Sequence, residues 1–226
     1  MTNERTLQIR DCIKEAQENE RETRSLEGYL ETKLPQMHHA IKLPEGNHAQ
    51  AMVRFLTSYI EHVPDFVDAL TEISIKAGIY DYANVFISIA EDYFLQPPDI
   101  LNDHKGLHAL IDEAYLAHRL IEEVNDKIMV SCGLPLAPID MTISNIVVHD
   151  LIGEEFANQL DLAVYYATES LFQQDNFTNN PQFCAYIDDH RKNGWDDILK
   201  KWPCLAGDSS VELSLSSTKA NDSFHY

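Results

Sequence analysis

Two histidines lie where a ligand could be held between helices. His118 and His149 each fall on the apolar stripe of one of two long helices that we expect at residues 102–131 and 140–172. A histidine that faces a core must have its ring nitrogens satisfied, so it is either a hydrogen-bonded core residue or a ligand for something bound between the helices. Hydrogen-bonded core histidines are the commoner of the two, and that is our expectation here.

Two glutamates accompany these histidines. Glu122 lies one turn after His118 at the flank of the same stripe, and Glu155 lies at the edge of the helix that carries His149. Imidazole and carboxylate groups on facing helices can hold iron or another divalent metal ion, as in helical oxidases with a haem-oxygenase-like fold. The alternative to a hydrogen-bonded core is therefore a metal site formed by His118, His149, Glu122 and Glu155.

A ferritin-like di-iron centre is disfavoured. Such a centre takes a Glu-x-x-His motif from each of two helices, and the single match, Glu45 to His48, lies in a loop rich in proline and glycine. The acidic residues that could supplement it fall opposite the apolar stripes of their own helices: Glu61, Glu72, Glu91, Glu154 and Asp161. We expect these side chains to face solvent.

We expect a second set of histidines to lie in solvent, at the edge of the apolar stripe of its helix. His104, His108 and Asp112 are spaced at i, i+4 and i+8, and a histidine pair at i, i+4 can chelate zinc or copper. These residues lie at the edge of the apolar stripe, and Gly106 in the first turn weakens the geometry of a chelating pair.

The sequence lacks the familiar catalytic and nucleotide-binding motifs. It contains no GxGxxG, GxxxxGK[ST], GxSxG or HExxH pattern and no EF-hand loop. With 8 glycines in 226 residues, there is little from which to build a phosphate-binding loop.

The net charge of -20 limits the partners that the chain can have. Most of it lies between Leu43 and Gln173. Such a surface repels phosphate backbones and anionic membranes, so we expect neither nucleic-acid nor membrane binding. A protein partner, basic in character, fits this charge better, and homodimer formation is left open.

The scattered cysteines and the shortness of the apolar runs favour a cytoplasmic protein. Cys12, Cys132, Cys184 and Cys204 are scattered and form no CxxC motif, so we expect reduced thiols. No apolar run reaches the length of about 18 to 20 residues that a membrane-spanning helix needs, and the chain opens without an apolar signal segment.

The hydrophobic pattern predicts an all-α fold. Apolar residues recur at helical spacing along most of the chain, and short connections favour antiparallel neighbours. Pro64 is expected to break or kink the helical run that starts near residue 48. Asn180 and Pro181 suit the cap and first turn of a C-terminal helix. We predict a single-domain antiparallel helical bundle of about six to eight helices.

We expect this bundle to occupy residues 1–205 and a flexible tail to follow at 206–226. The parts of the bundle are a long N-terminal helix at 1–34, an acidic central bundle at 48–173 and small C-terminal helices at 181–203. The tail is rich in serine and other polar residues. Its alternating Val211, Leu213 and Leu215 could instead add a strand to the edge of a partner protein.

Two functions from different classes fit these features. The preferred one is a non-catalytic protein-interaction or regulatory module, for which no cofactor is expected. The alternative is an oxidase-like or oxygenase-like helical enzyme, or a binding protein, that holds a metal, haem or small organic ligand between the two central helices. The alternative requires a pocket at His118 and His149.

Overall fold

Helices make up most of the chain that the computed structural model describes, which is residues 4–97, 106–174, 177–195 and 211–213. Their bounds are α1 Glu4–Thr23, α2 Ser25–Lys33, α3 His48–Lys76, α4 Tyr80–Leu95, α5 Leu107–Cys132, α6 Thr142–Ile152, α7 Glu154–Gln174 and α8 Pro181–Asn193. Short 3-10 turns at Leu34–Gln36 and Phe177–Asn179 and two short strands, β1 Ile41–Lys42 and β2 Glu212–Leu213, complete the described elements. The predicted all-α bundle is confirmed. Within the described ranges, no helix has the length and apolar character that crossing a membrane requires.

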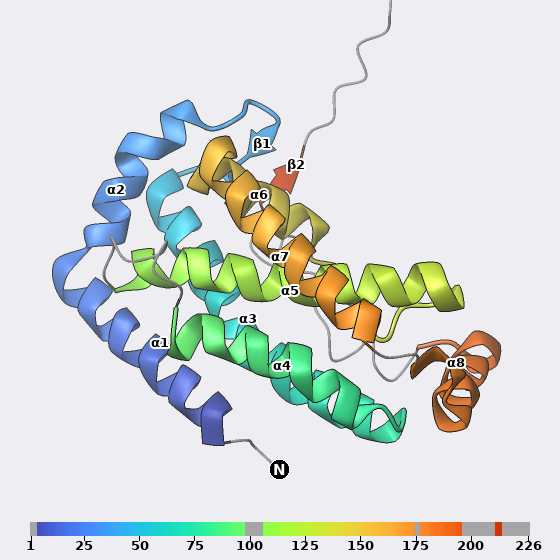
Figure 1. Cartoon of the computed structure of the whole chain (residues 1–226). Helices are drawn as coiled ribbons and strands as arrows, with labels where there is room; N and C mark the ends of the chain where they lie inside the picture. The colour runs from blue at the N-terminus through green and yellow to red at the C-terminus, as the bar shows by residue number, and fades with distance from the viewer. Residues whose placement is uncertain (1–3, 98–105, 175–176, 196–210, 214–226) are drawn as a thin grey trace, which may run out of the picture.

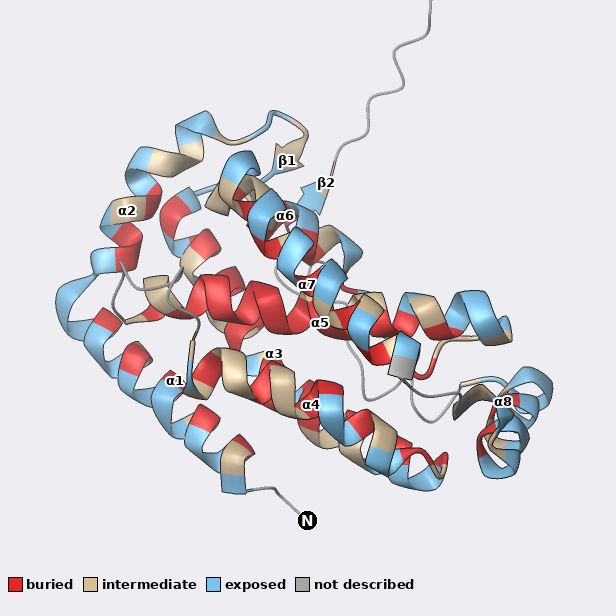
Figure 2. Ribbon diagram, in the orientation of Figure 1, coloured by how far each residue is buried: buried red, intermediate tan, exposed pale blue. Residues whose placement is uncertain are grey.

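Helix α5 runs through the middle of the bundle (Figure 1). It contacts α1, α2, α3, α4, α6 and α7, and every residue from 110 to 118 is buried. Figure 2 shows this as a nearly continuous buried stretch, whereas α8 and the outer face of α1 are largely exposed. The polar residues of this stretch have little access to water, so they must find partners inside the protein.

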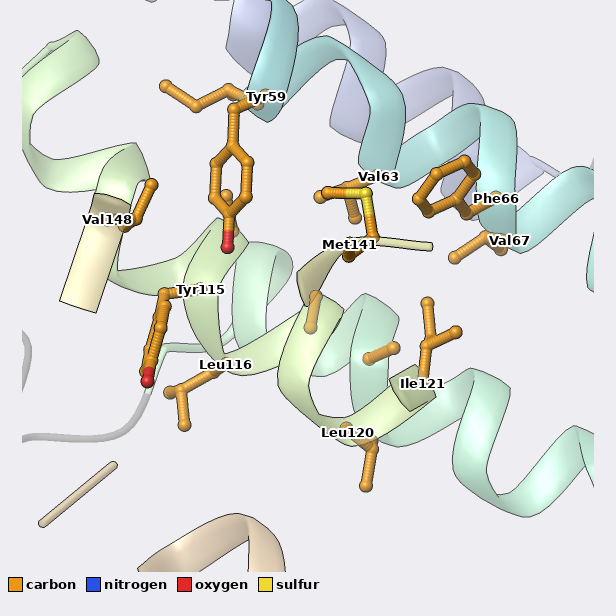
Figure 3. Close-up of a cluster of buried hydrophobic side chains, with 14 of the residues drawn as sticks. Tyr59, Val63, Phe66, Val67, Tyr115, Leu116, Leu120, Ile121, Met141 and Val148 are labelled. Atoms are coloured by element: carbon orange, nitrogen blue, oxygen red, sulfur yellow. The ribbon is translucent and has the colours of Figure 1, made fainter. Parts of the chain in front are cut away.

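Aromatic and branched side chains fill the contact between α3, α5 and α6 (Figure 3). The buried residues there include Tyr59, Val63, Phe66 and Val67 from α3, Tyr115, Leu116, Leu120 and Ile121 from α5, Val148 from α6, and Met141 just before α6. Buried side chains of this size contribute roughly 1.5 to 3 kcal/mol each, so this cluster is a major source of the bundle's stability.

Pro64 does not end a helix. Helix α3 continues through it to Lys76, although proline lacks the N–H for one backbone hydrogen bond. The apolar stripe stays in phase across the proline, since Ile60 and Val63 before it and Val67 after it are all buried. Burial of that stripe outweighs the lost hydrogen bond, so of the two expected outcomes, a break or a kink, the break does not occur.

The predicted N-terminal helix at 1–34 is interrupted at Arg24. Arg24 has a φ of 50°, in the left-handed region, and separates α1 from α2. The Glu20 carboxylate explains the interruption, because it accepts hydrogen bonds from the backbone N–H of Leu26 at 2.8 Å and of Glu27 at 3.0 Å. A side chain that bonds to backbone N–H groups offers the chain an alternative to a continuous helix. Glu20 thereby caps the first turn of α2.

The long helix predicted at 140–172 is two helices that meet at Gly153. This glycine ends α6 and precedes α7, and its φ of 103° is one that residues with a Cβ rarely adopt. The side-chain contacts of α5 show that the chain turns back here. Contacts with α6 run in opposite sequence order: Glu122 with Asn145 and Tyr115 with His149. Contacts with α7 run in the same order: Arg119 with Asp161 and Lys127 with Glu169.

The C-terminal region is described only in part. Helix α8 begins as predicted, with the Asn180 side chain accepting hydrogen bonds from the N–H groups of Gln182 and Phe183 and with Pro181 in the first turn. The second small helix expected up to residue 203 lies outside the described residues. Of the predicted tail at 206–226 the structure describes only 211–213. There β2 pairs with β1 in antiparallel register, so this piece adds a strand to the chain's own edge.

Replacing Gly153 should destabilise the fold through backbone strain alone. Nothing lies within 4 Å of a Cβ built at this position, so Gly153→Ala causes no clash, but its positive φ should cost about 1 to 2 kcal/mol of unfolding free energy. Gly28→Ala is the matched control, because Gly28 lies inside α2 with equally open surroundings and should gain up to about 1 kcal/mol. Urea denaturation measures both. Equal stabilities of the two variants would contradict a strained turn at Gly153.

Candidate functional site

His118 is a buried core histidine. Its side chain is 1% exposed, and its Nε2 lies 2.8 Å from the backbone oxygen of Tyr59 on α3. Because a carbonyl only accepts, Nε2 carries the proton in this contact. The ring packs against Tyr59 and Phe66. Burial lowers the pKa of His118 to about 3, so the imidazole is neutral and acts as a polar link between α5 and α3.

His149 occupies a different environment. It is partly buried on α6, and its Nε2 lies 3.3 Å from Asn158 Oδ1 and 3.9 Å from Asp161 Oδ2, both on α7. Its ring also faces Tyr115 of α5 edge-on. The two predicted histidines therefore contact different neighbours, His118 on the α3 side of α5 and His149 between α5 and α7.

The two predicted glutamates are also separated. Glu122 forms an ion pair with Arg119 and accepts a hydrogen bond from Asn145 Nδ2 at 2.8 Å. Glu155 is exposed in the first turn of α7. Only Glu122 and His149 line the same pocket, while His118 and Glu155 do not.

The four-residue metal site stays a prediction. Within the described ranges, no group of three or more His, Cys, Asp or Glu side chains is arranged to hold a metal ion. Residues 98–105, which include His104 of the second histidine set, lie outside the described ranges. The other two members of that set lie near α2: the ring of His108 packs on Tyr29, and Asp112 is buried.

The pocket that contains Glu122 and His149 lies between α5, α6 and α7. Its volume is about 340 Å³. It is lined by Tyr115, Arg119 and Glu122 from α5, by Thr142, Asn145, Ile146 and His149 from α6, and by Asp161 from α7. The lining residues of α5 and α6 recur at intervals of three and four, which places each set on one face of its helix. The reversal at Gly153 brings the third wall, α7, into place.

Arg119 connects the carboxylates of this pocket. Its Nε donates to Asp161 Oδ1 at 2.9 Å, and its Nη1 donates to Glu122 Oε2. Burial opposes the guanidinium charge, but the hydrogen bonds and the negative charges of Asp161 and Glu122 more than offset this and raise the pKa of Arg119. Arg119 thus stays charged and holds both carboxylates in fixed positions.

Two tyrosines extend this network into the core. The Tyr115 hydroxyl donates to Asp161 Oδ1 at 3.0 Å, and the Tyr59 hydroxyl donates to Asn145 Oδ1 at 2.7 Å. Burial is the main cause of a raised pKa at both hydroxyls, so both remain protonated donors. Asn145 in turn donates to Glu122, which completes a path of hydrogen bonds from the α3–α5 contact to the pocket wall.

Sequence reasoning missed most of this site. Asp161 was expected to face solvent, whereas it is half-buried and paired with Arg119. Glu91, expected outside as well, is 1% exposed and lies 2.7 Å from Arg5 Nε of α1. Both errors have one cause, because a helix in this bundle is covered on more than its most apolar side. Asn145, a polar residue within the apolar run of α6, was an available signal.

Two further buried carboxylates lie on α5, away from the pocket. Burial raises the pKa of Asp112 to about 7, and burial together with the nearby Asp112 raises the pKa of Glu113 to about 8. Glu113 Oε2 has no hydrogen-bond partner within the described ranges. The cavity beside Asp112 has a volume of only about 60 Å³, too small for an organic ligand. We therefore expect Asp112 and Glu113 to affect the stability of the fold and not the binding of a ligand.

Comparison of the chain with protein-family models, with curated proteins and with solved structures gave no match.

The buried Glu113 should make stability depend on pH. Its folded-state pKa is raised, so between about pH 4.5 and pH 8 the folded protein keeps a proton that the unfolded chain has lost. Stability should therefore fall with rising pH in this window, by about 1.4 kcal/mol per pH unit for this group. Glu113→Gln, which resembles the protonated form, should be more stable than the natural protein by a margin that grows up to pH 8.

The control for this prediction is Glu18→Gln, which removes one carboxylate from an exposed position of α1. Chemical denaturation at half-unit intervals between pH 5 and pH 9 compares the three proteins. A stability difference between Glu113→Gln and the natural protein that stays constant over this range would count against the raised pKa.

Proposed function

We propose that this protein binds a small polar organic molecule in the pocket between α5, α6 and α7. One observation carries the proposal: a pocket of about 340 Å³ in which polar groups from three helices converge, namely Arg119, Glu122, Asn145, His149 and Asp161. Ligand pockets commonly have volumes of about 300 to 1,000 Å³ and a few polar groups that orient the ligand. Tyr115 and Ile146 supply apolar surface beside these groups.

The ordering of the pocket supports binding. Arg119, Glu122 and Asp161 are held by hydrogen bonds to one another and to Tyr115 and Asn145 before any ligand arrives. Groups fixed in advance lose little conformational entropy on binding. We propose a cytoplasmic setting, in which the free thiols of the described cysteines stay reduced.

The test is a fragment screen on the ¹⁵N-labelled full chain by NMR. Bound fragments should shift the backbone signals of α5, α6 and α7 around the pocket. Ile146→Trp, which places a bulky ring at the pocket wall, should weaken such binding at least about tenfold. Val130→Trp is the matched control, because Val130 is 87% exposed and does not line the pocket. Shifts that lie elsewhere, or that survive Ile146→Trp unchanged, would contradict the proposal.

A second candidate function is binding of a basic protein through the outer face of α7. Leu162, Tyr165 and Tyr166 are 52%, 48% and 64% exposed there. Large exposed apolar residues grouped on one helix suggest a contact surface. Helix α7 has no lysine or arginine, and although Asp161 and Glu169 pair with cations of α5, Glu154 and Glu155 are exposed in its first turn, so a partner segment with positive charge complements this helix.

Site-specific photo-crosslinking tests this candidate in cells. A photoreactive residue at position 166 should give one dominant adduct with a basic protein, and the adduct should weaken at high ionic strength and in Leu162→Ser. The same residue at Tyr80, an exposed tyrosine on α4, is the control. Identical adducts from both positions would refute a specific surface on α7, and an adduct with a second copy of the chain would indicate a homodimer instead.

A further inference from the structure

Four donor atoms of the pocket are engaged with its own carboxylates, while two of its acceptor atoms are left over. Arg119 Nε and Nη1, the Tyr115 hydroxyl and Asn145 Nδ2 all donate to the pocket's own carboxylates. His149 Nε2 contacts Asn158 Oδ1.

The remaining acceptors belong to charged groups. Glu122 Oε1 has only a long contact of 3.4 Å from the Thr142 hydroxyl. Asp161 Oδ2 accepts no hydrogen bond within the described ranges, and the nearest cationic candidate, His149 Nε2, is 3.9 Å away. Both oxygens can accept a strong, charge-assisted hydrogen bond from a donor in the pocket.

The charge balance points the same way. Arg119 supplies one positive charge against the two carboxylates of Glu122 and Asp161, so these three groups together carry one excess negative charge. The segment around the pocket carries most of the chain's net charge of -20. A field of this sign concentrates small cations near the pocket and repels anions.

We infer that the ligand is a small organic cation, with a primary ammonium group that donates to Asp161 Oδ2 and Glu122 Oε1 and a compact apolar body against Tyr115 and Ile146. This inference rests on the proposed function, since it names the chemical class of the molecule that the same pocket takes. The ammonium group meets both requirements of the site: it has three donors and no acceptor, and it supplies the missing positive charge.

Three probes of similar size and different charge test the ligand class: benzylamine, benzyl alcohol and benzoate. In NMR titrations of the full chain, benzylamine should bind at least about tenfold more tightly than benzyl alcohol, and benzoate should be the weakest of the three. Asp161→Asn keeps the shape of the side chain and an acceptor for Tyr115 but removes the charge. It should lower benzylamine affinity about tenfold and leave benzyl alcohol affinity within about twofold.

Glu155→Gln is the matched control, because it removes one charge from α7 outside the pocket and should change benzylamine affinity by no more than about twofold. Thermal unfolding of each variant verifies its fold. If benzyl alcohol or benzoate binds best and Ile146→Trp blocks it, the cationic class is wrong while the ligand pocket stands. If none of the three probes binds, the cationic class is again wrong, and the wider fragment screen then decides separately on the pocket itself.

Discussion

Burial of the middle of α5, where every residue from 110 to 118 is buried, is the constraint on which the rest of this structure depends. Polar side chains in and beside this stretch have little access to water, so they must be satisfied by neighbouring helices or kept neutral. His118 Nε2 bonds to a carbonyl of α3, although its Nδ1 has no hydrogen-bond partner within the described ranges, and Arg119 is held by carboxylates of α5 and α7. Asp112 and Glu113 are kept neutral by retaining their protons, at the expense of stability at higher pH.

The same constraint explains why the pocket is polar. Tyr59 belongs both to the apolar contact between α3 and α5 and, through Asn145, to the wall of the pocket. From Asn145 the hydrogen bonds continue to Glu122, Arg119 and Asp161. The pocket is therefore the point where the polar groups of the central helix reach the surface. Its geometry is set by the packing of three helices, and packed side chains tolerate little displacement.

Local sequence patterns were sufficient to predict the helices but not the points at which a helix is interrupted or continues. The spacing of apolar residues identified α4, α5 and α8, and Asn180 with Pro181 fixed the start of α8. The interruption at Arg24 depends on hydrogen bonds that backbone N–H groups of α2 donate to the Glu20 carboxylate, which is a local effect of side-chain chemistry. The continuity at Pro64 depends on burial of the stripe on both sides of the proline, and at Gly153 the direction of the chain is set by packing against α5. These last two outcomes are tertiary effects, and none of the three can be predicted from helical periodicity alone.

The candidate site was likewise predicted only in part. Glu122 and His149 were identified because each lies near an apolar stripe, but their partner Asp161 was placed on the solvent side, since only the register of α7 against α5 brings it to Arg119. Helix α7 is attached to α5 by that ion pair and by Lys127 with Glu169, and Lys127 also lies over the ring of Tyr165. A cation at Asp161 Oδ2 would share this carboxylate with Arg119, which donates to Oδ1. Helix α7 also carries the exposed Leu162, Tyr165 and Tyr166, so the proposed ligand and a partner at that surface would contact the same helix.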